Sequence, residues 1–141
     1  MNLQFMVKDK KKSNRIKTPT VLQMEATECG AASLTMVLAY YGLWLPLENV
    51  RDISGVSRDG LSAASIANVA RFFGCDAKGL RLSAERLRGM QPPMILFWEF
   101  NHFLVFEGIE GNTVYLICGG LLRVTRLFLK RCGQNVAKLT L

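Results

Sequence analysis

The sequence has only one histidine, His102, and four cysteines among its 141 residues. The cysteines, at positions 29, 75, 118 and 132, show neither a paired spacing nor the short spacing of metal ligands. A single histidine also argues against zinc. We therefore expect no metal site, no nucleotide site and no other cofactor in this chain.

Long hydrophobic runs are also absent. No apolar stretch reaches the roughly 20 residues that a bilayer-crossing helix needs, because Gly42, Pro46, Pro92 and Pro93 interrupt the longest candidates. The N-terminus lacks the apolar core, followed by small residues, that marks a secretory signal. These absences predict a cytoplasmic protein. Half of the residues are hydrophobic, which is enough for one domain with one core.

The positive charge of the chain is concentrated at its N-terminus. The formal net charge is +7, and residues 1–17 hold six basic side chains against Asp9 alone, so this segment supplies +5 of it. A nucleic-acid-binding segment would be expected to interleave aromatic residues with its basic ones. After Phe5, no aromatic residue lies among these lysines. We predict a flexible basic tail over residues 1–17, a domain over residues 18–141 and no nucleic-acid partner.

The apolar pattern changes from helical to strand-like along the chain. Helical spacing and flanking capping residues predict helices over residues 28–41, 46–53, 62–73 and 83–90. Short apolar, β-branched or aromatic runs predict strands over residues 94–97, 103–109, 113–116, 122–125 and 136–141. Helices followed by antiparallel strands are typical of an α+β domain, with a cleft between the helical half and the sheet.

Three residues suggest nucleophilic catalysis by a thiol. Cys29 would lie in the first turn of the first helix, capped by Thr27, where the helix dipole favours negative charge. His102 is the only imidazole that could serve it, and the side-chain amide of Gln23, six residues before the cysteine, could donate to an oxyanion. Taken singly, each has a plain structural explanation, because a cysteine or a histidine in an apolar segment is often only part of the core.

Taken together, two tracts resemble those of a known family. Residues 23–37, which contain Gln23 and Cys29, resemble the cysteine motif of the bacteriocin-processing peptidase domain found at the N-terminus of peptidase-containing ABC transporters. Residues 93–108, which contain His102, resemble its histidine motif. The resemblance extends from Thr18 to the C-terminus and implies a papain-like fold, with Cys29 as nucleophile, His102 as general base and Gln23 as oxyanion-hole donor.

The resemblance also implies a substrate and partners. The family cleaves the leader from precursor peptides, such as bacteriocins and lanthipeptides, after a double-glycine motif. The mature peptide is then exported by the membrane and ATPase parts of the transporter, which would place this domain at the cytoplasmic face of a bacterial inner membrane. A free-standing processing protease is the other arrangement that the sequence allows.

The sequence departs from the family at one catalytic position. The family orients its histidine with an aspartate, usually in an Asp-Pro segment after the strand that follows the histidine strand. Here residues 114–116 match that strand, and Cys118 stands at the acid's position. A thiol is a weak hydrogen-bond partner. The substitution predicts a weaker or pH-shifted peptidase, and the alternative is a leader-binding domain with little or no catalysis.

Apolar side chains suggest where a leader could bind. We expect the amphipathic helix of a leader to lie in an apolar groove on the helical half, with Tyr40, Tyr41 and Leu61 as candidate contacts. Trp98, close to His102 in the sequence, is the candidate wall of a narrow cleft for the two glycines. Each of these side chains could equally be ordinary core or surface packing.

Overall fold

The computed structural model describes residues 13–82, 84–98, 102–111, 113–119, 123–127 and 136–140. Three α-helices come first, α1 (Cys29–Tyr40), α2 (Leu47–Ser54) and α3 (Ala63–Phe72), with the short 3-10 helices η1 (Ala26–Glu28) and η2 (Ala84–Gly89). Among these described residues, no helix has both the length and the apolar character to cross a membrane.

The ends of the helices follow local chemistry. Ser62 caps α3, because its side chain accepts a hydrogen bond from the Ser65 backbone N–H. After α2 the chain turns at Gly55, which adopts a left-handed conformation that favours glycine. The residue that caps α1 is Glu28, not the predicted Thr27, because η1 runs through Glu28 and leads directly into α1. Cys29 is therefore the first residue of α1 itself.

Six antiparallel strands form one sheet in the order β1-β6-β2-β3-β4-β5. The strands are β1 (Lys78–Leu82), β2 (Met94–Trp98), β3 (His102–Glu110), β4 (Thr113–Ile117), β5 (Arg123–Leu127) and β6 (Val136–Thr140). β2 and β3 are neighbours in the sheet, and Trp98 pairs directly with His102. β1 and β6 lie at one side of this pair, and β4 and β5 at the other.

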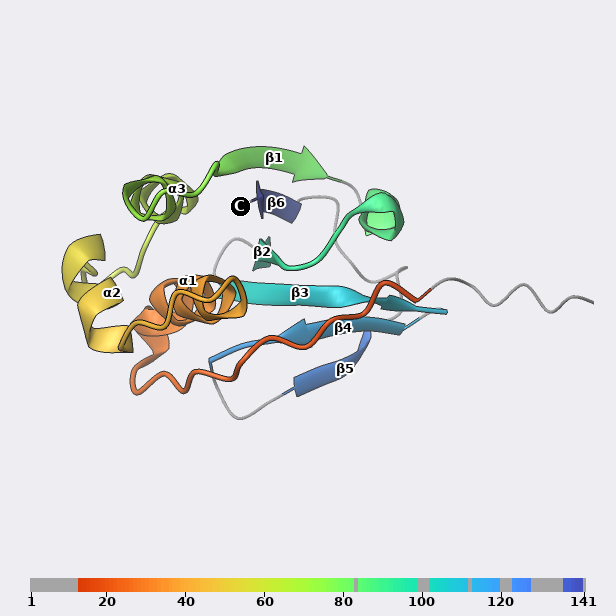
Figure 1. Ribbon diagram of the computed structural model, residues 1–141, viewed down its shortest axis with the longest axis horizontal. Coiled ribbons are helices and arrows are strands. Elements are labelled where there is room, and N and C mark those ends of the chain that lie inside the picture. The colour runs from red at the N-terminus through yellow and green to blue at the C-terminus, as the bar shows by residue number, and fades with distance from the viewer. Residues whose placement is uncertain are drawn as a thin grey trace, which may run out of the picture.

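The main core lies between the helices and the sheet. Figure 1 shows the three α-helices on one side of the molecule, with α1 beside β3. Every residue of α1 from Cys29 to Ala39 is buried, so the helix is covered on all sides. Phe103 and Val105 of β3 pack in this helix-facing cluster, whereas Leu104 and Phe106 belong to a second cluster on the opposite face.

The segment before the first helix is attached to β3. Asn14 accepts a hydrogen bond from the Ile109 N–H, and the Ile16 N–H donates to the Glu107 carbonyl. The buried Glu107 carboxylate accepts from both the N–H and the hydroxyl of Thr18, each at 2.8 Å. Residues 14–17, which we predicted to be part of a flexible tail, therefore already contact the sheet, and residues 1–12 lie outside the described part of the chain.

The predicted α+β class is confirmed, and most predicted elements are present. The first three helices begin and end within one residue of their predicted bounds. The expected strands are all found, with differences of one or two residues at their ends. The prediction missed β1, and it placed an α-helix where η2 forms. Ser83, expected to cap that helix, lies outside the described residues.

Candidate active site

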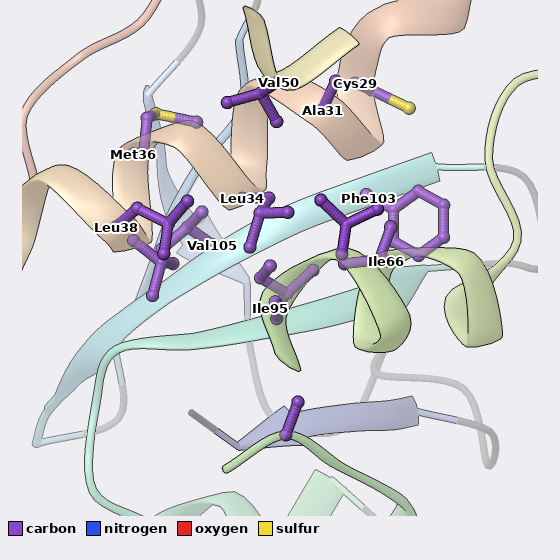
Figure 2. Close-up of a cluster of buried hydrophobic side chains, with 14 of the residues drawn as sticks. Cys29, Ala31, Leu34, Met36, Leu38, Val50, Ile66, Ile95, Phe103 and Val105 are labelled. Carbon is purple, nitrogen blue, oxygen red and sulfur yellow. The ribbon is translucent and has the colours of Figure 1, made fainter. Parts of the chain in front are cut away.

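Cys29 stands at the first position of the buried helix α1. The residue is 7% exposed, and it belongs to the helix-facing core together with Ile66 and Phe103. Figure 2 shows its side chain at the beginning of α1, in the layer where the helices meet the strands. The thiol is thus held at the N-terminal end of a twelve-residue helix, where the helix dipole stabilises an anion.

His102 is the first residue of β3 and is only partly buried. Because side chains alternate along a strand, His102 begins on the face of Leu104 and Phe106, opposite the face of Phe103. Burial lowers the pKa of its imidazole below the ordinary value. The imidazole of His102 therefore stays uncharged down to a lower pH than the imidazole of an exposed histidine.

The beginnings of α1 and β3 lie side by side. A Cβ placed on Gly30, which follows Cys29, would lie 3.2 Å from Cδ2 of Phe103, which follows His102. The same Cβ would lie 2.9 Å from Cδ1 of Ile66, so a larger residue here would require the Ile66 side chain to shift. The cysteine and histidine tracts, more than 70 residues apart in the sequence, are thereby brought to one end of the sheet.

Gln23 lies at this end of the sheet too, against the end of β4. Its N–H donates to the Gly119 carbonyl at 2.7 Å. A Cβ on Gly119 would lie 2.8 Å from both Oε1 of Gln23 and Cβ of Ala32, one turn along α1 from Cys29. The Gln23 Nε2 donates to the Glu25 carbonyl at 3.1 Å. One of its two N–H groups is thereby engaged, and the second remains as a donor.

Cys118 follows β4 and is 9% exposed. Ile117 pairs with Val105, and continuing this register by one residue places Cys118 opposite Leu104. Cys118 and Leu104 share the second core cluster, on the face where His102 begins. The position that would hold an orienting acid is therefore on the same face of the sheet as the histidine, two residue pairs along, as a diagonal neighbour.

No carboxylate takes over the role of that acid within the described residues. His102 makes no hydrogen bond or ion pair with an acidic side chain there, and Glu107 is engaged by Thr18. Three other residues near the histidine motif, Glu99, Asn101 and Asn112, lie outside the described part. The same described residues contain no cluster of histidine, cysteine and acidic side chains that could hold a metal ion.

The four predicted substrate contacts lie in different places. Leu61 is beside the site, because its Cβ would be 3.4 Å from a Cβ on Gly30. Tyr40 and Tyr41, 38% and 58% exposed, are at the other end of α1. That is about 16 Å from Cys29, at 1.5 Å of helix rise per residue. The Trp98 backbone pairs with His102, but its side chain lies outside what the structure describes.

A charged pair next to Cys29 escaped the sequence analysis. Glu28, which directly precedes Cys29, is 2% exposed, and its Oε1 lies 2.9 Å from Nη1 of Arg51 on α2. No sequence pattern links two residues that are 23 positions apart in different helices. The only available signal was the position of an acidic residue beside the cysteine.

Comparison with known proteins gives one consistent result. Residues 17–120 match the model of the peptidase C39 family. The chain is 32% identical, over 100 residues, to the colicin V secretion/processing ATP-binding protein CvaB of Escherichia coli. This match covers 71% of the present chain but only 14% of CvaB.

Two solved structures are similar throughout. One is a double glycine motif protease from an AMS/PCAT transporter, crystallised with the leader peptide. It superposes with a TM-score of 0.81 at 43% identity, and the match covers 88% of this chain and 91% of that one. The peptidase domain of Streptococcus ComA superposes with a TM-score of 0.72 at 21% identity, with coverages of 85% and 94%. The papain-like fold expected from the sequence is thereby confirmed, and the chain belongs to the peptidase C39 family.

Proposed function

We propose that this domain is a cysteine peptidase that removes the leader from precursor peptides by cutting after a double-glycine motif. The observation that carries the proposal is the meeting of three elements at one end of the sheet. Cys29 begins α1, His102 begins β3, and Gln23 is held between the end of β4 and α1. These residue types supply a nucleophile, a base and an oxyanion donor.

In the proposed reaction the thiolate of Cys29 attacks the carbonyl carbon of the second glycine. The carbonyl oxygen becomes an oxyanion, and the second N–H of the Gln23 amide donates to it. His102, protonated by the thiol, passes this proton to the leaving amine as the peptide bond breaks. Water, deprotonated by His102, then hydrolyses the thioester, releases the leader and returns the thiol.

The packing around Gly30 favours a substrate with small residues at its cleavage site. Leu61, Ile66 and Phe103 crowd Gly30, the residue after Cys29, and we expect little space for substrate side chains beside the thiol. Two glycines would pass where larger residues clash. The exposed aromatic side chains at the far end of α1, Tyr40 and Tyr41, are candidates for contacts with the apolar face of a leader helix.

We also propose that the domain works as part of an export transporter. The chain spans only 14% of the length of CvaB, whose name describes both secretion and processing. The partners would be a precursor peptide and the membrane and ATPase domains of an ABC transporter. The site would then face the cytoplasm, where precursor peptides are made.

Mass spectrometry of a cleavage reaction tests this function. The domain would be incubated with a synthetic leader ending in Gly-Gly and extended by several residues. We expect a single cut after the second glycine. A matched peptide with valine in place of that glycine should bind but not be cut, because its side chain clashes near the thiol. Equal cleavage of both peptides would contradict double-glycine specificity.

Cys118 gives one reason to retain a second candidate function. No carboxylate is bonded to His102 among the described residues, so the partner that fixes the tautomer and orientation of an imidazole is missing from that part of the chain. A domain with such a histidine could bind leaders and hold them for the transporter without cutting. Saturable leader binding without any product would favour this function over the peptidase.

Placing an acid at position 118 should move the pH dependence of cleavage. The thiolate–imidazolium pair is lost as pH rises through the His102 pKa, which burial lowers. In Cys118→Asp a carboxylate would stabilise the imidazolium and raise this pKa. We expect the alkaline limb of kcat/KM to shift to higher pH. Cys118→Ser is the neutral control, and identical profiles for all three proteins would contradict the prediction.

A further inference from the structure

Glu28 is a buried carboxylate that the proposed reaction does not use. Its Oε2 accepts hydrogen bonds from the backbone N–H groups of Met24 and Glu25, at 2.8 and 3.1 Å. Its Oε1 accepts from Nη1 of Arg51 at 2.9 Å. Burial raises the pKa of Glu28, but the bonds from Met24, Arg51 and Glu25 together outweigh it and hold the pKa below its ordinary value. The side chain is therefore a fully engaged anion.

These bonds close the turn that joins Gln23 to Cys29. Glu28 holds the N–H of Glu25, and the carbonyl of the same Glu25 accepts from Nε2 of Gln23. The Gln23 amide is thus fixed through one intermediate residue by the Glu28 carboxylate. The carbonyl oxygen of the same amide, the buried Gln23 Oε1, has no hydrogen-bond partner among the described residues. It therefore provides no competing anchor.

Arg51 connects this turn to the helical layer. It lies on α2, which packs against α1, and its side chain is 42% exposed, whereas that of Glu28 is 2% exposed. A half-exposed ion pair adds little to stability. Its consequence here is geometric, because the guanidinium holds one carboxylate oxygen while the other remains directed at the turn.

We propose that Glu28 and Arg51 are positioning residues that orient the Gln23 amide toward the oxyanion. The proposal rests on the proposed peptidase function and deepens it. Neither residue touches the substrate. Their effect passes from the carboxylate through Glu25 to the Gln23 amide, so it should influence formation of the tetrahedral intermediate and leave both leader binding and the thiol unaffected.

Kinetics of Glu28→Gln test the proposal on the cleavage reaction. The glutamine keeps the size of the side chain but loses the charge and its pairing with Arg51. We expect kcat to fall by about 10- to 100-fold, since small misplacements of catalytic groups have effects of this size, with KM unchanged. Arg51→Met should also lower kcat. Arg51→Lys, which keeps the positive charge, should retain part of the wild-type rate. Glu48→Gln, an exposed acid on α2, is the matched control and should cleave normally.

A double-mutant cycle separates positioning from a purely structural role. If Glu28 acts through Gln23, Glu28→Gln should cause no further loss in a Gln23→Ala background. The rate of Cys29 alkylation by iodoacetamide, which needs no oxyanion donor, should be unchanged. Additive losses, slower alkylation, or an unchanged kcat in Glu28→Gln and Arg51→Met would each overturn the inference while the wild-type protein still cuts. A wild-type protein that does not cut would instead overturn the proposed function, and the inference with it.

Discussion

Replacing Cys29 with alanine is expected to reduce cleavage of a double-glycine leader peptide below detection. Loss of the nucleophile in a well-studied serine peptidase lowers kcat by roughly 10⁶-fold, and a loss of that size would leave no detectable product. The change is small in size at a residue that is 7% exposed, so the fold should persist. Product formation by mass spectrometry, together with leader binding by calorimetry, measures both consequences.

Cys75 provides the matched control for this experiment. It is half-buried at the edge of the same core, and burial raises the pKa of its thiol, which makes it a poor nucleophile at neutral pH. Cys75→Ala should therefore retain wild-type turnover. If Cys29→Ala still cut after the second glycine, or if Cys75→Ala abolished the cut, Cys29 would not be the nucleophile.

The helices and strands could largely be predicted because their signals are local. The serine that caps α3 is adjacent in the sequence to the periodic apolar residues of that helix. In the same way, a glycine follows the end of α1 closely. β1 was missed for a related reason. Its five residues include Gly79 and two basic residues, and it becomes a strand because β6, near the other end of the chain, pairs with it.

The residue types of the candidate site stay a prediction, whereas the contacts that hold them could not be predicted from the sequence. Cys29, His102 and Gln23 could be recognised as a set because two tracts resemble a family. The partners that hold them are set by contacts across the fold, such as Gly30 against Phe103 and Gly119 against Gln23. Nothing in the spacing of these residues indicates such contacts, because they depend on how α1 crosses the sheet.

The attachment of the N-terminal segment illustrates the same limit. Lysines up to position 17 suggested a solvated tail, yet the segment from Asn14 onward is bound to β3. Gly108 makes this possible. It has φ near +129°, and a Cβ there would lie 2.6 Å from Cα of Arg15. A glycine in the middle of a strand can signal such a close approach, but it does not identify the segment that approaches.

Removal of the Gln23 side chain should have the second-largest effect on the reaction. In Gln23→Ala we expect kcat to fall by about 10²- to 10³-fold, the range seen when one oxyanion-hole donor is lost. KM for the leader should change little, because the amide donates to charge that develops only after the thiol attacks. Gln91→Ala is the matched control, because Gln91 is exposed and lies on the segment before β2.

The Gln23 substitution also distinguishes the role of the amide from its role in packing. The hydrogen bond from the Gln23 backbone N–H to the Gly119 carbonyl survives in Gln23→Ala. The packing of the Gln23 side chain against Gly119 is mostly lost. Gln23→Glu keeps this shape but presents a carboxylate to the oxyanion, so it should be at least as slow as Gln23→Ala. If Gln23→Glu instead cut at the wild-type rate, the shape of the side chain would be sufficient for catalysis. The oxyanion donor would then have to be another group.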